Sequence, residues 1–180
     1  MQHLGLIALI PILPMAIIIA AKFPLVSRLS ASENIARNRY SQLLFSTVFT
    51  PVTVLYYSFL VGWLGPHYGV SWVFYLLTVI AFFAQLIVTW VPARGKRALK
   101  VHTGAAYVVA LVMPSIIGLI LASIKGVSLV GAIASITFLL ITLVIIVLFF
   151  FVPKARNRFT HFELGYFVSF WVVIILLTYL

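Results

Sequence analysis

Long stretches without a charged residue constrain this chain more than any other feature. A membrane helix needs about 20 consecutive apolar residues, and a soluble domain carries about 25% charged residues. Here 64% of the residues are hydrophobic and only 8% are charged. The pattern predicts an integral membrane protein. The charge-free stretches are residues 1–21, 40–93, 101–124, 126–153 and 164–180.

The stretch 40–93 is long enough for two spans, and the cluster Gly65 to Gly69 is its natural break. A β-barrel is excluded because segments such as 143–151 are apolar on every face instead of alternating. We therefore predict an all-α fold, with 1–180 forming a single six-helix transmembrane domain built from three helix hairpins. The expected helices are 3–22, 32–64, 70–91, 101–124, 127–152 and 160–180.

The basic residues predict the orientation of these hairpins. Eleven of the twelve Lys and Arg residues fall in the loops after the first, third and fifth helices, and only Lys125 lies on the opposite side. Because basic loops stay in the cytoplasm, we expect both termini outside. These cations are also expected to contact anionic lipid, whereas nucleic acid is not an expected partner. The proposed lipid contacts are Arg37, Arg39, Arg94, Lys96, Arg97, Arg156 and Arg158.

Local motifs indicate how the hairpins are built. Ser30 and Glu33 fit a capping box, and Thr160 and Glu163 repeat its spacing. The first and third basic loops share an Ala-Arg-Asn-Arg-aromatic segment, at 36–40 and 155–159. Either convergence or hairpin duplication explains the repeat. The pattern Gly131-x-x-x-Ser135 permits close helix approach, within the chain or with a partner.

Two missing residue types remove many intramembrane chemistries. The chain has no Asp and no Cys, so paired-aspartate proteolysis and thiol redox chemistry are excluded, and no nucleophile elbow is present. We therefore expect a protein that is not an enzyme, and we expect no metal site. His161 and Glu163 point about 200° apart on a helix, which disfavours a joint site with His102.

Polar side chains inside the spans are the candidate functional residues, because each is costly in lipid. They fall at a similar depth on four of the helices, where they either bond neighbouring helices or line a pocket open to the cytoplasm. Glu163 is either a capping residue or a protonatable group at the mouth of this pocket. The predicted ligand-binding residues are Thr47, Thr50, Gln85, His102, Tyr107, His161, Glu163 and Tyr166.

The leading hypothesis is a small protein that binds or transports a hydrophobic or anionic small molecule, or lipid, through this polar layer. One alternative is an accessory or scaffolding subunit of a membrane complex, with a membrane-protein partner or a homo-oligomer. The other is an electron carrier with haem b held by two histidines. His102 and His161 would serve one side and His3 and His67 the other, although all four lie at helix ends. The leading hypothesis requires no cofactor.

Overall fold

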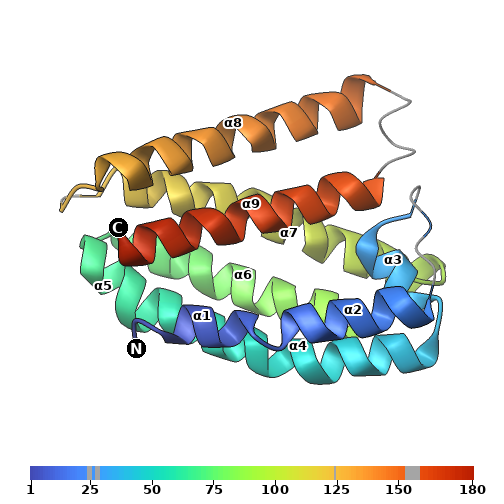
Figure 1. The fold of residues 1–180 in the computed structure, drawn as a ribbon. Helices are drawn as coiled ribbons and strands as arrows, with labels where there is room; N and C mark the ends of the chain where they lie inside the picture. Colours follow the sequence, from blue (N-terminus) through green and yellow to red (C-terminus); the bar gives the residue numbers. More distant parts are fainter. Residues whose placement is uncertain (24–25, 27–28, 124, 153–158) are drawn as a thin grey trace.

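The computed structural model describes residues 1–180 except 24–25, 27–28, 124 and 153–158 (Figure 1). The described residues form helices and no strand. Six helical stretches are long and apolar enough to cross a membrane, so the chain is an integral multi-pass membrane protein. The predicted all-α six-helix bundle is confirmed.

The first expected helix is split in two. α1 spans Leu4–Leu9 and α2 spans Ile12–Lys22, with Pro11 at the amino end of α2. Pro11 and Pro14 both lack a backbone N–H, so the helical ladder loses two neighbouring bonds here. Together α1 and α2 still form one candidate span.

The second expected helix also begins differently. A short helix α3, Ala31–Ala36, precedes the membrane helix α4, Arg39–Phe59. The predicted capping box is confirmed: Glu33 N donates to Ser30 Oγ at 3.0 Å, and Ser30 N donates to Glu33 Oε2 at 2.8 Å. This capping box starts α3. The side chain of Asn38 caps α4 by accepting a hydrogen bond from Tyr40 N.

The break falls at Gly69, within the predicted cluster, but the helix before it ends at Tyr68 instead of residue 64. The helix continues from α4 through a π-helical turn, Leu60–Leu64, into α5, Gly65–Tyr68. Pro66 has no N–H, and a wider turn before it accommodates the lost bond. Gly69 ends the helix with φ +61°, where Gly69 N bonds Pro66 O and Val70 N bonds Gly65 O. This Schellman motif favours glycine.

The remaining helices follow the expected order. α6 spans Trp72–Trp90, α8 spans Leu129–Phe151, and α9 spans Phe159–Tyr179. α7, Lys96–Leu121, begins five residues before the expected position, because no helix breaker follows Gly95. Its first turns therefore carry basic residues that were expected in a loop.

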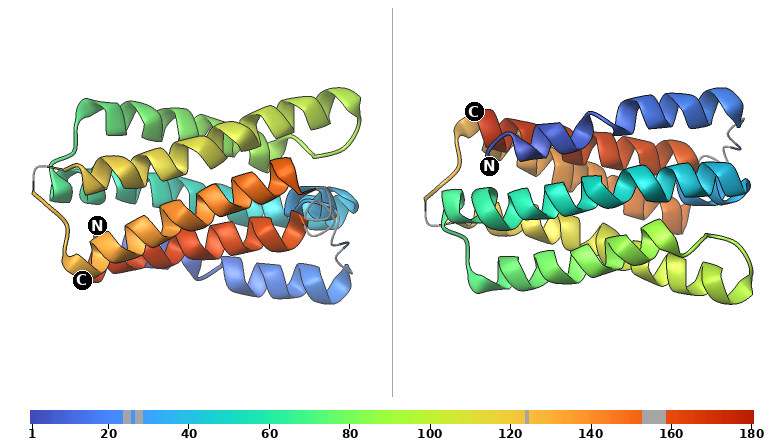
Figure 2. Two further views of the ribbon diagram at one scale, coloured as in Figure 1. Left: turned by 90° about the horizontal axis from the view of Figure 1, so that it is seen from above. Right: turned by 90° about the horizontal axis from the view of Figure 1, so that it is seen from below.

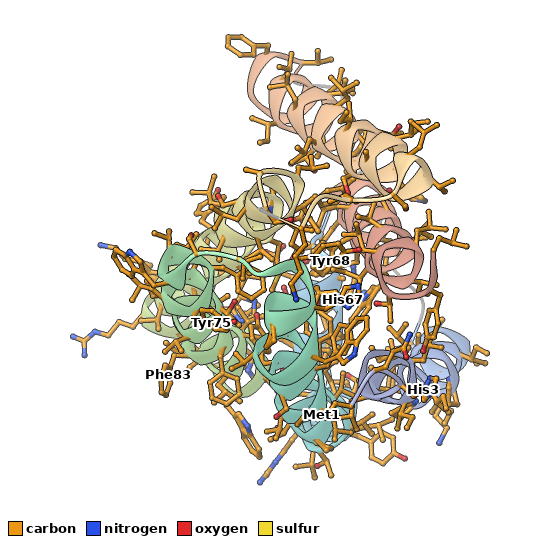
Figure 3. All side chains as sticks on the ribbon, turned by 90° about the vertical axis from the view of Figure 1, so that its left-hand side faces the viewer. Met1, His3, His67, Tyr68, Tyr75 and Phe83 are labelled. Atoms are coloured by element: carbon orange, nitrogen blue, oxygen red, sulfur yellow. The ribbon has the colours of Figure 1, made fainter. Side chains whose placement is uncertain are left out.

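Contacts between helices close into a ring, seen end-on in Figure 3. In ring order the neighbours are α1, α4, α6, α7, α8 and α9, and α9 returns to α1. Both termini lie at one end of the bundle (Figures 1 and 2). There Gln2 Nε2 donates to Thr178 O at 3.1 Å, and His3 Nδ1 lies 3.0 Å from Tyr179 Oη.

Exposed tryptophans mark the level of α6 in the bilayer. Trp72 and Trp90, its first and last residues, are 72% and 56% exposed. Tryptophan favours the membrane–water interface. A helix of 19 residues is about 28 Å long, close to the hydrocarbon thickness of about 30 Å. The ends of α6 therefore indicate the two membrane–water interfaces.

Candidate functional site

A small cavity lies among α4, α6, α7 and α9. Its volume is about 40 Å³. These are the four helices on which the sequence places its polar layer. Its walls are mostly aromatic, and none of the described lining residues carries a charge. The lining residues are Phe49, Val52, Thr53, Tyr56, Tyr57, Gln85, Val109, Met113, Tyr166, Phe167, Phe170 and Trp171.

Unpartnered polar groups line this cavity. The hydroxyls of Tyr56 and Tyr57 are buried and have no hydrogen-bond partner within the part of the chain that the structure describes. The side-chain amide of Gln85 likewise makes no hydrogen bond to a described residue, although Gln85 is nearly buried. Thr53 differs, because its hydroxyl donates to Phe49 O within α4 at 2.8 Å. Three residues of the cavity lining thus carry a polar group without a described hydrogen-bond partner.

Aromatic packing holds the two tyrosines in place. Tyr56 contacts Trp171 edge to face, with ring centroids 4.5 Å apart, and meets Tyr57 in the same way at 5.5 Å. Tyr57 also packs edge to face on Phe82 of α6 at 5.5 Å. Such pairs contribute about 0.5–1.5 kcal/mol each beyond area burial. The ring contacts fix the side chains while their hydroxyls stay unpaired.

Tyr166 joins α9 to a carbonyl that a proline has freed. Pro114 lies inside α7 and cannot donate to Ala110 O, four residues earlier. The Tyr166 hydroxyl donates to that oxygen at 3.2 Å. The side chain also lines the cavity, so Tyr166 connects the cavity wall to the carbonyl that Pro114 leaves free in α7.

The carboxyl end of α6 is capped by side chains from two other helices. Ser46 Oγ and Gln42 Nε2 of α4 donate to Thr89 O at 2.6 and 3.2 Å. His102 Nδ1 lies 2.7 Å from Val91 O, and because a carbonyl only accepts, Nδ1 carries the proton. These bonds satisfy terminal carbonyls that lipid cannot.

This role places His102 away from the cavity lining. The ring is 4% exposed, and its Nε2 is buried without a hydrogen-bond partner among the described residues. Its hydrogen bond connects α7 to the end of α6.

Of the eight predicted ligand-binding residues, Gln85 and Tyr166 line the cavity. Thr47, Tyr107 and His161 are exposed on the outer surface of their helices. Thr50 accepts a hydrogen bond from Trp90 Nε1 at 3.0 Å and donates to Ser46 O. The structure therefore does not bring the eight residues into one pocket.

Glu163 makes a contact that the sequence did not suggest. Its Oε2 accepts a hydrogen bond from Ala31 N at 2.6 Å. The carboxylates of Glu33 and Glu163, the only acidic residues of the chain, thus bind adjacent backbone N–H groups at the start of α3. This contact ties α3 to α9, and the side chain of Thr160 lies outside the described side chains.

Except for Lys125, the described basic residues gather at the end opposite the termini. Among the predicted lipid contacts, Arg37, Arg39, Arg94, Lys96 and Arg97 are exposed. Arg156 and Arg158 lie outside the described residues. Lys125 is at the other end, where its Nζ donates to Pro66 O at 3.0 Å.

The described residues contain no cluster of three or more His, Asp or Glu that could bind a metal ion. His3, His67 and His161 lie near the ends of their helices, as predicted, whereas His102 lies in the second turn of α7 because that helix begins at Lys96. His3 stacks on Tyr179, and His67 stacks on Trp63 with ring centroids 4.7 Å apart. Haem ligation remains an untested alternative from the sequence.

Sequence reasoning did not select Tyr56 and Tyr57, although both line the cavity. Their signal is weak, because tyrosine is common near membrane interfaces and its ring is apolar. The adjacency of the two tyrosines within a long charge-free stretch is the one feature that could have pointed to them.

Comparisons with known proteins yield no relative. No family model, no curated protein and no solved structure matches this chain.

Proposed function

We propose that this protein binds, and moves within the membrane, a neutral apolar molecule that carries one hydrogen-bonding group. The observation behind the proposal is the cavity among α4, α6, α7 and α9, with the unpaired hydroxyls of Tyr56 and Tyr57 and the amide of Gln85. The molecule's polar group would bond these three side chains.

The cost of unpaired polar groups supports a guest. A buried hydroxyl without a partner costs about 1–3 kcal/mol, and lipid supplies no alternative partner. Phenylalanine would fill the same space at both tyrosine positions without this cost. Polar groups inside membrane spans are typical of substrate pathways. In the empty protein, water would take the position of the ligand's polar group.

The size of the cavity limits what enters it. A volume of about 40 Å³ holds roughly two or three water molecules, whereas pockets for whole small ligands measure about 300 Å³ or more. Only a polar group fits in the closed form. Phe49, Phe167 and Trp171 are half-buried, so the cavity approaches the surface where α4 faces α9. The apolar body would enter there, directly from the bilayer.

The charge of the lining favours a neutral ligand. Because no lining residue is charged, an anionic group would lose its hydration without gaining an opposite charge. Tyrosine hydroxyls and a glutamine amide all donate hydrogen bonds, which suits a carbonyl oxygen. We therefore narrow the ligand class from hydrophobic or anionic molecules to neutral molecules with a carbonyl or hydroxyl group.

Fluorescence of Trp171, a lining residue, tests the proposal. In a variant with Trp63, Trp72 and Trp90 changed to Phe, we expect menadione, an apolar ring with two carbonyls, to quench the remaining tryptophan saturably. Gln85→Leu and Tyr57→Phe should each weaken binding about tenfold, the effect of one hydrogen bond of about 1.4 kcal/mol.

Matched variants serve as controls. Tyr68→Phe removes a buried tyrosine hydroxyl that bonds Leu177 O, away from the cavity, and should leave the menadione affinity unchanged. Thr78→Val removes a buried hydroxyl of α6 that bonds Phe74 O, and it should also leave the menadione affinity unchanged. Quenching that never saturates, or equal losses in Tyr57→Phe and Tyr68→Phe, would refute the site. Saturation by oleate but not by menadione would refute a neutral ligand.

A further inference from the structure

A second concave region lies on the outer face of α6 and α7, separate from the internal cavity. This groove has a volume of about 680 Å³, and apart from Lys100 its walls are apolar. Its α6 side runs from Val79 to Ile87 and its α7 side from Lys100 to Val108. It shares no lining residue with the cavity.

Small residues between larger ones create this groove. Ala84 and Ala105 are buried at its floor, and Phe83 and Val101 project from its rims. Phe83 is 60% exposed and lies at the periphery of the bundle in Figure 3. A Cβ atom at Gly104 would meet no atom within 4 Å, so this part of the wall is open. The result is a furrow between two helices with its open side toward lipid.

The length of the furrow matches one leaflet. Each wall covers eight residue steps, which is about 12 Å along a helix. Half of the hydrocarbon core is about 15 Å thick. The Lys100 end lies near the level of Ile87, one turn from the interfacial Trp90. The furrow therefore runs from the headgroup level to near the middle of the bilayer.

Lys100 gives the furrow a charged mouth. Among the described lining residues it alone is charged, and it lies at the interfacial end. Arg94, Lys96 and Arg97 are exposed nearby in sequence. A lysine at this level extends its ammonium group to the headgroups while its carbon chain stays in the apolar wall. Each such cation attracts an anionic headgroup by about 1 kcal/mol.

We propose that this furrow is a binding site for an anionic phospholipid, with one acyl chain between α6 and α7 and the phosphate on Lys100. A second copy of this chain fits less well. Two copies in one bilayer share an orientation, so the same face on each would place their basic ends together and repel. The lipid instead supplies the opposite charge at the mouth and a flexible chain for the furrow.

Native mass spectrometry of the purified protein with added lipid tests the proposal. We expect wild-type protein to retain one more bound molecule of palmitoyl-oleoyl phosphatidylglycerol than of the phosphatidylcholine with the same acyl chains. Lys100→Gln should lower the preference for the anionic lipid about fivefold. Lys22→Gln removes an exposed lysine at the same end of the bundle, outside the furrow, and should keep the preference.

A second pair of variants tests the acyl-chain site independently of charge. Gly104→Leu fills the furrow and should reduce retention of both lipids. Gly118→Leu adds the same bulk on α7, also where a Cβ meets no atom within 4 Å, and should have no effect. The proposal fails if Lys100→Gln and Lys22→Gln behave alike, or if Gly104→Leu binds lipid as the wild type does. A dimer that Gly104→Leu abolishes would identify a second copy as the occupant instead.

Discussion

At the residue scale, the buried tyrosines divide by what their hydroxyls contact. Tyr68 donates to Leu177 O at 2.6 Å and Tyr166 donates to Ala110 O, whereas Tyr56 and Tyr57 have no partner among the described residues. The same chemical group therefore serves two purposes. Two hydroxyls connect helices, and two are buried without a described partner on residues that line the cavity.

Substitution by phenylalanine separates these purposes. Tyr68→Phe should lower the free energy of unfolding by about 1 kcal/mol, because it leaves Leu177 O without its donor. Tyr56→Phe and Tyr57→Phe should be neutral or stabilising, since each removes an unpaired polar atom. Denaturation in mixed micelles, followed by circular dichroism, gives the values. A loss in Tyr57→Phe equal to that in Tyr68→Phe would show that the hydroxyl is already bonded.

The hydrogen bond from Tyr166 to the carbonyl that Pro114 leaves free can be tested separately. Tyr166→Phe should cost about 1 kcal/mol in wild-type protein, because Ala110 O loses the hydrogen bond that the tyrosine hydroxyl donates to it. In a Pro114→Ala background the new N–H reaches that oxygen, so the same substitution should cost less. A double-mutant cycle measures the coupling. Additive effects would mean that the proline does not create the need for the hydroxyl.

Helix phase explains which site residues could be predicted from the sequence. Gln85 and Tyr166 were identified because polar groups inside apolar helices are rare. Thr47 and Tyr107 lie at similar depth but are exposed, because depth alone does not tell which face of a helix is buried. Glu163 was predicted near a pocket or in a local cap. Its partner, Ala31, is distant in sequence and only the folded structure reveals it.

At the scale of elements, long apolar stretches predicted the six spans, but local backbone bonding determined their ends. The break between α1 and α2 and the separation of α3 from α4 depend on caps and prolines within a few residues. The extension of the helix through Pro66 depends on a π-helical turn that no sequence pattern here indicated. Hydropathy, averaged over a span, does not resolve such features.

The packing of α8 is testable at Gly131. The sequence motif left open whether this glycine faces a partner, and the structure places it against α9: an added Cβ would lie 3.1 Å from Leu177 Cδ2, and also 2.8 Å from Val127 Cγ1 just before α8. Gly131→Leu should therefore lower stability by about 1–3 kcal/mol through overpacking. Gly118→Leu is the matched control, and unfolding in mixed micelles measures both. Equal stability of the two variants would contradict the assigned α8–α9 contact.

At the scale of the whole molecule, the proposed orientation places the basic end in the cytoplasm and the termini outside. The absence of cysteine makes a direct test simple, because each introduced thiol is the only one. Ser71→Cys should react with a membrane-impermeant maleimide on intact cells, whereas Arg94→Cys should react only after permeabilisation. Both positions are exposed and lie at opposite ends of α6. The reverse labelling pattern would invert the orientation.

The ring of helices has a consequence for the order of assembly. Gln2 bonds Thr178, a residue 176 positions later. Helix α1 also contacts α4, where Gly5 lies against the ring of Phe59. At roughly 5–20 residues per second, ribosomes need about 9–35 s to pass from one partner to the other. During this time the surface of the first helix that will contact α9 is exposed to lipid. Assembly is therefore completed only when the last helix arrives and takes its place between the first and the fifth spans.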